Sequence, residues 1–64
     1  MKLNKFLLNR LANDVEYNTF TSFNLLLEDK DFNQLVFKLL ENANEDNYDD
    51  IVNELSSYAN CNIC

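Results

Sequence analysis

Gly and Pro are both absent from this chain of 64 residues, and their absence constrains the fold more than any other feature of the sequence. Tight hairpin turns usually need Gly or Asn at positive φ, and Gly and Pro commonly separate one strand from the next. Asn can replace Gly in the left-handed region, and Asn occurs twelve times. We therefore expect an all-α fold, a small compact bundle of three to four short helices joined by Asn- and Asp-rich turns.

The length and the apolar content predict one folded domain. A chain of 64 residues is near the lower limit for a hydrophobic core, but a content of 47% hydrophobic residues is too high for a disordered tail. No linker divides the chain, so residues 1–64 are expected to form a single helical domain, with residues 60–64 as a flexible tail. The abundance of Asn and the single Arg suggest a low-GC genome, such as that of a Gram-positive bacterium or one of its phages.

Hydrophobic periodicity predicts the first two helices. An amphipathic helix is expected over residues 3–16, with Phe6 and Leu8 widening its apolar stripe. The i, i+4 row of that stripe consists of Leu3, Leu7, Leu11 and Val15. A short second helix is expected in residues 23–29, with a side-chain cap from Thr19, Thr21 or Ser22.

The second half of the chain predicts two longer helices. Residues 31–34 resemble a capping box, in which Asp31 accepts from the Gln34 amide and Gln34 reaches back. The expected buried face behind it consists of Phe32, Leu35, Val36, Leu39, Leu40 and Ala43. After a turn at residues 42–47, Asp46 or Asn47 is expected to cap a helix to about residue 59. Its expected buried face consists of Tyr48, Ile51, Val52, Leu55 and Ala59.

Enzyme chemistry finds little support in the sequence. The chain contains no His, no Gly-rich phosphate loop and no nucleophile elbow, and its Ser residues have no evident general base. The only cysteines, Cys61 and Cys64, form a C-x-x-C at the end of the chain. That spacing would suit a zinc site shared by two chains, a redox pair or a disulfide, but a closed zinc site needs four ligands. We expect reduced thiols in a tail, and neither a metal nor a cofactor.

Charge is distributed unevenly along the chain. Residues 1–13 carry three basic side chains and no acid, residues 14–40 carry five acids and two lysines, and residues 41–64 carry six acids and no base. These give +3, −3 and −6, the net charge of −6. Such a surface repels phosphate backbones, so direct nucleic-acid binding is not expected. The acidic half is instead expected to attract a basic surface, although acids near a helix start also stabilise the helix.

One large apolar side chain falls outside the predicted stripes. Phe37 lies on the polar side of the third helix, and exposed aromatics on small proteins often mark an interface. The residues expected to contact a partner are therefore Phe37, Glu45, Asp46, Asp49, Asp50 and Glu54.

These observations favour a non-enzymatic protein that binds another protein, and they suggest the partner's basic nucleic-acid-binding groove as the surface bound. Small size, acidity and codon bias suggest an inhibitor of a host or defence factor, encoded by a phage or mobile element and resembling an anti-CRISPR protein only in general character. The alternatives are a structural module with a merely solubilising acidic face, and a homo-oligomeric regulator, such as an antitoxin or small transcriptional regulator, whose basic first helix binds DNA. No export signal or spanning segment is apparent, so a cytoplasmic location and no membrane contact are expected. A homodimer is possible.

Overall fold

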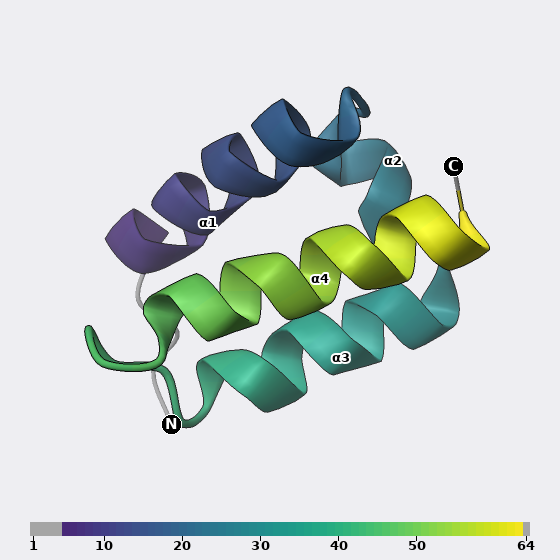
Figure 1. The fold of residues 1–64 in the computed structure, drawn as a ribbon. Coiled ribbons are helices and arrows are strands. Elements are labelled where there is room, and N and C mark those ends of the chain that lie inside the picture. Colours follow the sequence, from purple (N-terminus) through teal and green to yellow (C-terminus); the bar gives the residue numbers. More distant parts are fainter. Residues whose placement is uncertain (1–4, 64) are drawn as a thin grey trace.

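The computed structural model describes residues 5–63, which form four helices and no strand (Figure 1). The helices are α1 (Lys5–Thr19), α2 (Phe23–Leu27), α3 (Lys30–Leu40) and α4 (Tyr48–Asn62). α4 packs against both α1 and α3, and the short α2 joins α1 to α3 at the end of the bundle where α4 finishes (Figure 1). The prediction of a small all-α bundle is confirmed.

All four helices contribute to one core. The ring of Phe23 on α2 meets the edge of the Phe32 ring on α3, with 5.8 Å between the ring centroids. The buried apolar side chains are Leu11, Val15, Phe23, Leu26, Phe32, Val36, Tyr48, Ile51, Val52, Leu55 and Ala59. The expected buried face of the fourth helix is confirmed in full. Three positions on α3 that were expected to be buried are only half-buried, because α3 lies at the edge of the bundle; they are Leu35, Leu39 and Leu40.

α1 continues to Thr19, three residues beyond its predicted end, and its predicted first two residues lie outside the described part of the chain. The helix ends because Phe20 adopts a φ of 56°, in the left-handed region. The sequence predicted Asn for such a position, and among residues 5–63 Phe20 alone has positive φ. Glu16 then receives the first amide of α2, since Phe23 N–H donates to its carboxylate at 2.6 Å. Ser22 occupies the N-cap position without a side-chain cap bond.

The cap of α3 is Asp29 and not Asp31. α3 begins one residue before the predicted capping box, and the Asp29 carboxylate accepts a hydrogen bond from Phe32 N–H at 2.9 Å. Asp31 lies in the first turn instead, where its charge favours the helix dipole. Asp is a favoured capping residue at position 29 and at position 31, so the sequence pattern alone did not distinguish Asp29 from Asp31.

Asn side chains build the turn between α3 and α4, as predicted. Asn44 N–H donates to the side-chain oxygen of Asn47 at 2.8 Å, and Asn47 N–H donates to that of Asn44 at 3.0 Å. The Asn47 side-chain amide also donates to the carbonyl of Asn42 at 2.8 Å. Asn47 therefore lies at the N-cap position of α4, but its side chain forms hydrogen bonds within the turn and makes no cap bond.

The structure continues α4 into the residues that were predicted to form a flexible tail. α4 continues to Asn62, three residues beyond its predicted end, and Ile63 packs partly buried against the core. Cys61 is exposed on this last turn, whereas Cys64 lies outside the described residues. The apolar Ile63 extends the α4 stripe, which explains why the helix does not stop at Ala59.

Candidate functional site

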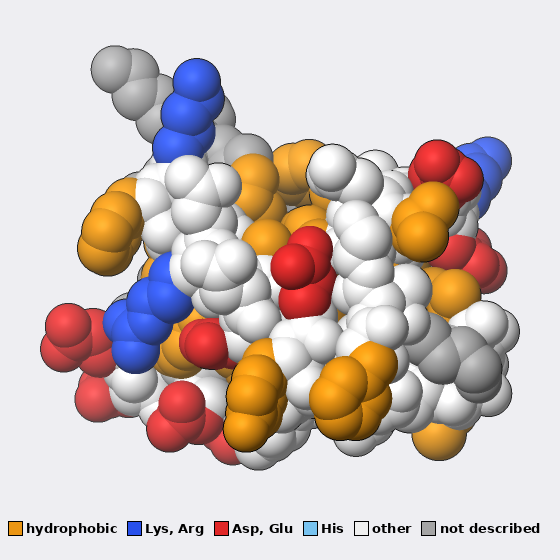
Figure 2. All heavy atoms as spheres, turned by 90° about the horizontal axis from the view of Figure 1, so that it is seen from above, with side chains coloured by type: hydrophobic (Ala, Val, Ile, Leu, Met, Phe, Trp, Pro, Cys, Tyr) orange, Lys and Arg blue, Asp and Glu red, His pale blue; other side chains and the backbone are white. Residues whose placement is uncertain are grey.

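The acidic residues expected to contact a partner lie together at one end of the bundle. We call them the acidic face: all five are exposed, and they are Glu45, Asp46, Asp49, Asp50 and Glu54. Glu45 and Asp46 lie in the α3–α4 turn, and the other three lie in the first two turns of α4. Within residues 5–63, none of these carboxylates forms an ion pair or a hydrogen bond. In Figure 2, several carboxylates gather at the left-hand end of the molecule, which is the end where α4 begins in Figure 1.

Stabilisation of the α4 dipole explains only some of the five carboxylates in the acidic face. Asp49 and Asp50 occupy the first turn of α4, where each stabilises the helix dipole by about 0.3–1 kcal/mol. Glu54 follows Asp50 at i+4, a spacing at which two like charges destabilise a helix by about 0.2–0.5 kcal/mol. Glu45 and Asp46 precede the helix altogether. The acidic face therefore carries more negative charge than stabilisation of the N-terminus of α4 would explain.

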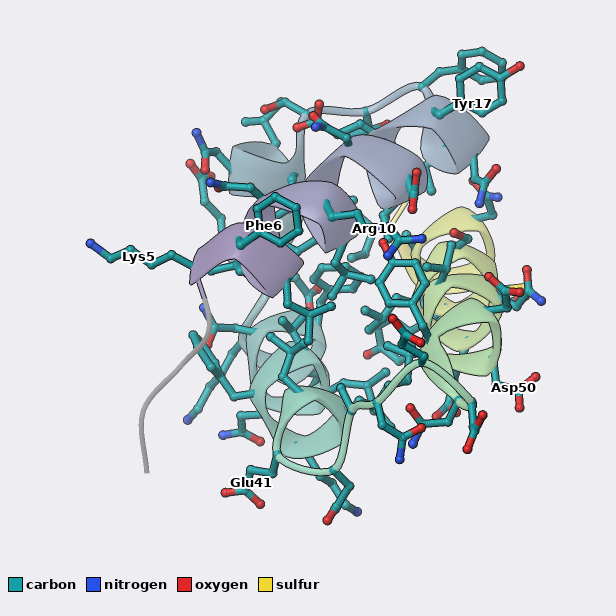
Figure 3. The ribbon with its side chains drawn as sticks, turned by 90° about the vertical axis from the view of Figure 1, so that its left-hand side faces the viewer. Lys5, Phe6, Arg10, Tyr17, Glu41 and Asp50 are labelled. Atoms are coloured by element: carbon teal, nitrogen blue, oxygen red, sulfur yellow. The ribbon has the colours of Figure 1, made fainter. Side chains whose placement is uncertain are left out.

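Phe37 is exposed, as predicted, but it is not part of the acidic face. It retains 42% exposure on α3, and it lies one turn before Glu41, whose amide donates to the Phe37 carbonyl at 3.2 Å. Figure 3 shows the side chains of Glu41 and Asp50 projecting in different directions from their helices. The structure thus separates the predicted contact residues into two surfaces.

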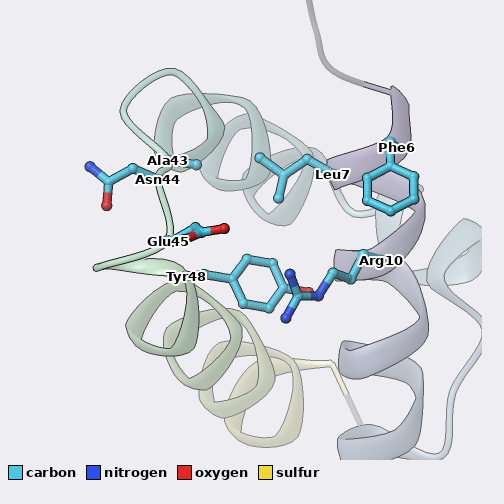
Figure 4. A pocket seen from close by; sticks show the side chains of 7 residues that line it. All are labelled: Phe6, Leu7, Arg10, Ala43, Asn44, Glu45 and Tyr48. Atoms are coloured by element: carbon cyan, nitrogen blue, oxygen red, sulfur yellow. The ribbon is translucent and has the colours of Figure 1, made fainter.

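A pocket of about 280 Å³ lies beside the acidic face, between the start of α1 and the α3–α4 turn (Figure 4). Its lining consists of Phe6, Leu7, Arg10, Ala43, Asn44, Glu45 and Tyr48. The Arg10 guanidinium lies over the Tyr48 ring, with 4.4 Å from Cζ to the ring centroid. The Tyr48 hydroxyl donates to the Asp14 carboxylate at 2.6 Å. Two residues of α1, one turn apart, thus hold the first residue of α4.

This arrangement keeps Tyr48 protonated. Burial chiefly raises the pKa of the phenol above its ordinary value, and the hydrogen bond to Asp14 and its negative charge raise it further. A phenol with a raised pKa is a hydrogen-bond donor and a poor nucleophile. The contacts of Tyr48 therefore fasten α4 to α1. The signal in the sequence was an Arg and an Asp at i, i+4 spacing on the first helix, but nothing indicated that Tyr48 lies opposite them.

A third feature was only partly anticipated: aromatic side chains stand exposed on α1 and at the residue that follows it. Phe6 is 79% exposed, Tyr17 81% and Phe20 92%. Phe6 was expected to widen the buried stripe, and that expectation is wrong, because the buried row of α1 runs through Leu11 and Val15 on another side of the helix. Tyr17 had no place in the predicted stripe, and its exposure agrees with that.

Other kinds of site find no support in the part of the chain that the structure describes. Residues 5–63 contain no group of three or more His, Cys, Asp or Glu side chains that could hold a metal ion. No described helix has the length and apolar character needed to cross a membrane. Comparison with known proteins found no matching family model, no matching curated protein and no matching solved structure.

Proposed function

We propose that this protein is a non-enzymatic binding module whose acidic face binds a basic surface on another protein. The observation that carries the proposal is the set of five exposed carboxylates at one end of the bundle, unpaired within residues 5–63. A basic surface would supply the counter-charges that the chain itself does not bring there. Such complementarity chiefly accelerates encounter and selects among partners.

The spacing of these charges supports a nucleic-acid groove as the surface that is bound. Asp49, Asp50 and Glu54 lie within five residue steps along α4, or about 7.5 Å of helix axis. Duplex DNA carries one negative charge per roughly 1.7 Å of its axis. These three acids supply one charge per about 2.5 Å of helix axis, between the spacing of a single DNA strand (about 3.4 Å) and that of the duplex. The acidic face can therefore occupy part of a groove and exclude nucleic acid from it. Phe37, on its separate surface, is a candidate for a second, apolar contact.

A more specific role follows from the same features. A small acidic protein that occupies a nucleic-acid groove would inhibit the enzyme to which the groove belongs. The low-GC composition and the net charge of −6 suit a phage or mobile-element protein that inhibits a host or defence factor in the cytoplasm, as anti-CRISPR proteins do. A structural module with a solubilising acidic face would need no partner, and the experiment below distinguishes the two.

The alternative of a DNA-binding regulator has weaker support. It depends on the basic start of α1, where Lys5 is exposed but Arg10 is packed on Tyr48 and lies one turn from Asp14. A cation already packed on an aromatic ring makes a weaker phosphate contact. A regulator of this kind would shift a DNA duplex in a gel at low salt, whereas the proposed inhibitor would not.

The test is affinity capture with an immobilised acidic-face variant beside the wild type. The variant neutralises the acidic face through the changes Glu45→Gln, Asp46→Asn, Asp49→Asn, Asp50→Asn and Glu54→Gln. A control neutralises exposed acids on other elements, three instead of five, through Glu28→Gln, Asp31→Asn and Glu41→Gln. The wild type and the control should retain the same protein from a host extract, excess duplex DNA should release it, and the acidic-face variant should not retain it. Equal retention by the acidic-face variant, with helicity unchanged, would overturn the proposal.

A further inference from the structure

The outward face of α1 carries a regular stripe that the described part of the chain covers only at Arg10, whose guanidinium lies over the Tyr48 ring. Phe6, Arg10, Asn13, Tyr17 and Phe20 follow one another at steps of four, three, four and three residues. This heptad spacing keeps the first four side chains on one side of α1, as in a coiled coil, and Phe20 follows directly after the end of the helix. Figure 2, which views the molecule from the α1 side, shows hydrophobic side chains standing out near both ends of this helix. We call these five residues the α1 stripe.

The backbone conformation of Phe20 is a second reason to regard the α1 stripe as an interface. Its φ of 56° lies in a region that costs a non-glycine residue on the order of 1–2 kcal/mol. Its ring is 92% exposed, so packing within the chain does not offset that cost. Gly or Asn would end α1 at lower cost. A contact that buries the ring against another molecule would compensate for the conformation.

From the symmetry of the α1 stripe we propose that a second copy of this chain covers it, with the two α1 helices antiparallel about a two-fold axis. The stripe is aromatic at both ends and polar in the middle, so its two ends can pair with each other across a two-fold axis. Antiparallel pairing sets Phe6 of one copy against the Tyr17–Phe20 end of the other. Arg10 and Asn13 then lie near the axis, where polar residues fix the register of helix pairs.

The charges of α1 match this orientation. Lys5 and Arg10 lie in its first half, and Asp14 and Glu16 lie in its second half. Antiparallel pairing brings each basic half beside an acidic half, whereas parallel pairing would bring like charges together. Arg10 and Asp14 already contact Tyr48, and Glu16 already accepts the Phe23 amide, so the charges select the orientation and add little affinity. The acidic face stays outside the contact, since Figure 3 shows Asp50 on α4 and Tyr17 on α1 projecting from different parts of the molecule.

The size of the contact predicts a weak dimer. An aromatic side chain buries about 150–250 Å², so six largely exposed rings and the polar residues between them supply on the order of 1,000 Å², near the lower limit for a specific interface. The net charge of −6 on each copy opposes association, and salt screens that repulsion. Added salt should therefore favour the dimer, although it weakens the binding of a basic partner.

Sedimentation equilibrium over a wide range of concentration tests the proposal. The wild type should show a monomer–dimer equilibrium that shifts toward dimer as salt is raised. Tyr17→Ser and Phe20→Asn should each weaken the dimer about tenfold or more, while Phe37→Ser, a change of another exposed ring, should leave it unchanged. All three positions are exposed, so the fold should survive, and circular dichroism checks that it does. A wild type that remains monomeric throughout, or a dimer that persists in both α1 variants, would overturn the proposal.

A cysteine placed near the axis tests the orientation. In a chain carrying Cys61→Ser and Cys64→Ser, the change Asn13→Cys should give a disulfide-linked dimer on mild oxidation. The matched control, Asn53→Cys in the same background, places an exposed cysteine on α4 and should give none. Equal cross-linking at the two positions would contradict antiparallel pairing through α1.

Discussion

The Arg10 guanidinium lies over the ring of Tyr48, with 4.4 Å from Cζ to the ring centroid. The hydroxyl of the same ring donates to Asp14 at 2.6 Å. Tyr48 is the first residue of α4 and is only 5% exposed. One side chain thus joins α1 to the beginning of the helix that carries most of the acidic face, so its contacts determine both the stability of the bundle and the position of those carboxylates.

Replacing this tyrosine should change stability in a pH-dependent way. Tyr48→Phe should destabilise the fold by about 1.5–3 kcal/mol at neutral pH, because Asp14 loses its hydrogen-bond donor. Because the pKa of Tyr48 is raised in the folded protein, its contribution to stability is complete below the ordinary phenol pKa of about 10 and is lost as pH rises above it. Melting temperatures between neutral and strongly alkaline pH should show this loss in the wild type. The loss should persist in Tyr17→Phe, which removes an exposed phenol, and diminish in Tyr48→Phe.

Two adjacent leucines test the short helix α2. Leu26 is fully buried, whereas Leu25 is 58% exposed. Leu26→Ala should therefore destabilise the fold by about 2–5 kcal/mol, enough to unfold a small domain of marginal stability. Leu25→Ala removes the same atoms from a solvated position and should cost less than about 1 kcal/mol. Chemical denaturation of both variants measures the difference, and similar costs would contradict the orientation of α2.

The cap of α3 gives a second matched pair. Asp29→Ala removes the acceptor of the Phe32 amide and should cost about 0.5–2 kcal/mol. Asp31→Ala removes only a charge near the helix start and should cost about 0.3–1 kcal/mol. Thermal unfolding should rank Asp29→Ala as the more damaging change. The opposite ranking would favour the capping box read from the sequence.

Phe20 should be replaceable with a gain in stability. Phe20→Gly or Phe20→Asn retains the left-handed conformation at lower cost, so either change should stabilise the monomer by up to about 1 kcal/mol. The same changes should weaken self-association, which separates the stability of the fold from the proposed interface. Unfolding at low protein concentration isolates the first effect, and a destabilised Phe20→Gly would show that the ring supports the monomer after all.

Local patterns in the sequence were sufficient for the helices and most of the core. The stripe from Tyr48 to Ala59 predicted the buried face of α4, and the absence of Gly and Pro predicted Asn-built turns. Contacts between distant residues were not predictable in the same way. The Glu16 carboxylate that receives the Phe23 amide and the pairing of Tyr48 with Asp14 depend on how the helices cross. Periodicity cannot show such crossings, because it describes one helix at a time.

The exposed aromatics show a related limit. Phe6 has the spacing of a core residue, but α1 buries the side that carries Leu11 and Val15. In the sequence, apolar residues that face the core and apolar residues that face solvent on the same helix form one broad stripe and cannot be told apart. The residues predicted to contact a partner lie on two separate surfaces for a similar reason. Phe37 is on α3 and most of the acidic residues are on α4, and local sequence patterns do not show how these two helices are rotated relative to each other.

The central claim, that the acidic face steers this protein onto a basic partner, is tested most directly by the association rate of the captured partner at several salt concentrations. Electrostatic steering makes that rate high at low salt and lowers it as salt screens the charges. The acidic-face variant should associate at least about tenfold more slowly at low salt and show a much weaker dependence on salt. The control lacking the acids at Glu28, Asp31 and Glu41 should behave much more like the wild type. An acidic-face variant that associates as fast as the wild type at low salt would contradict the claim.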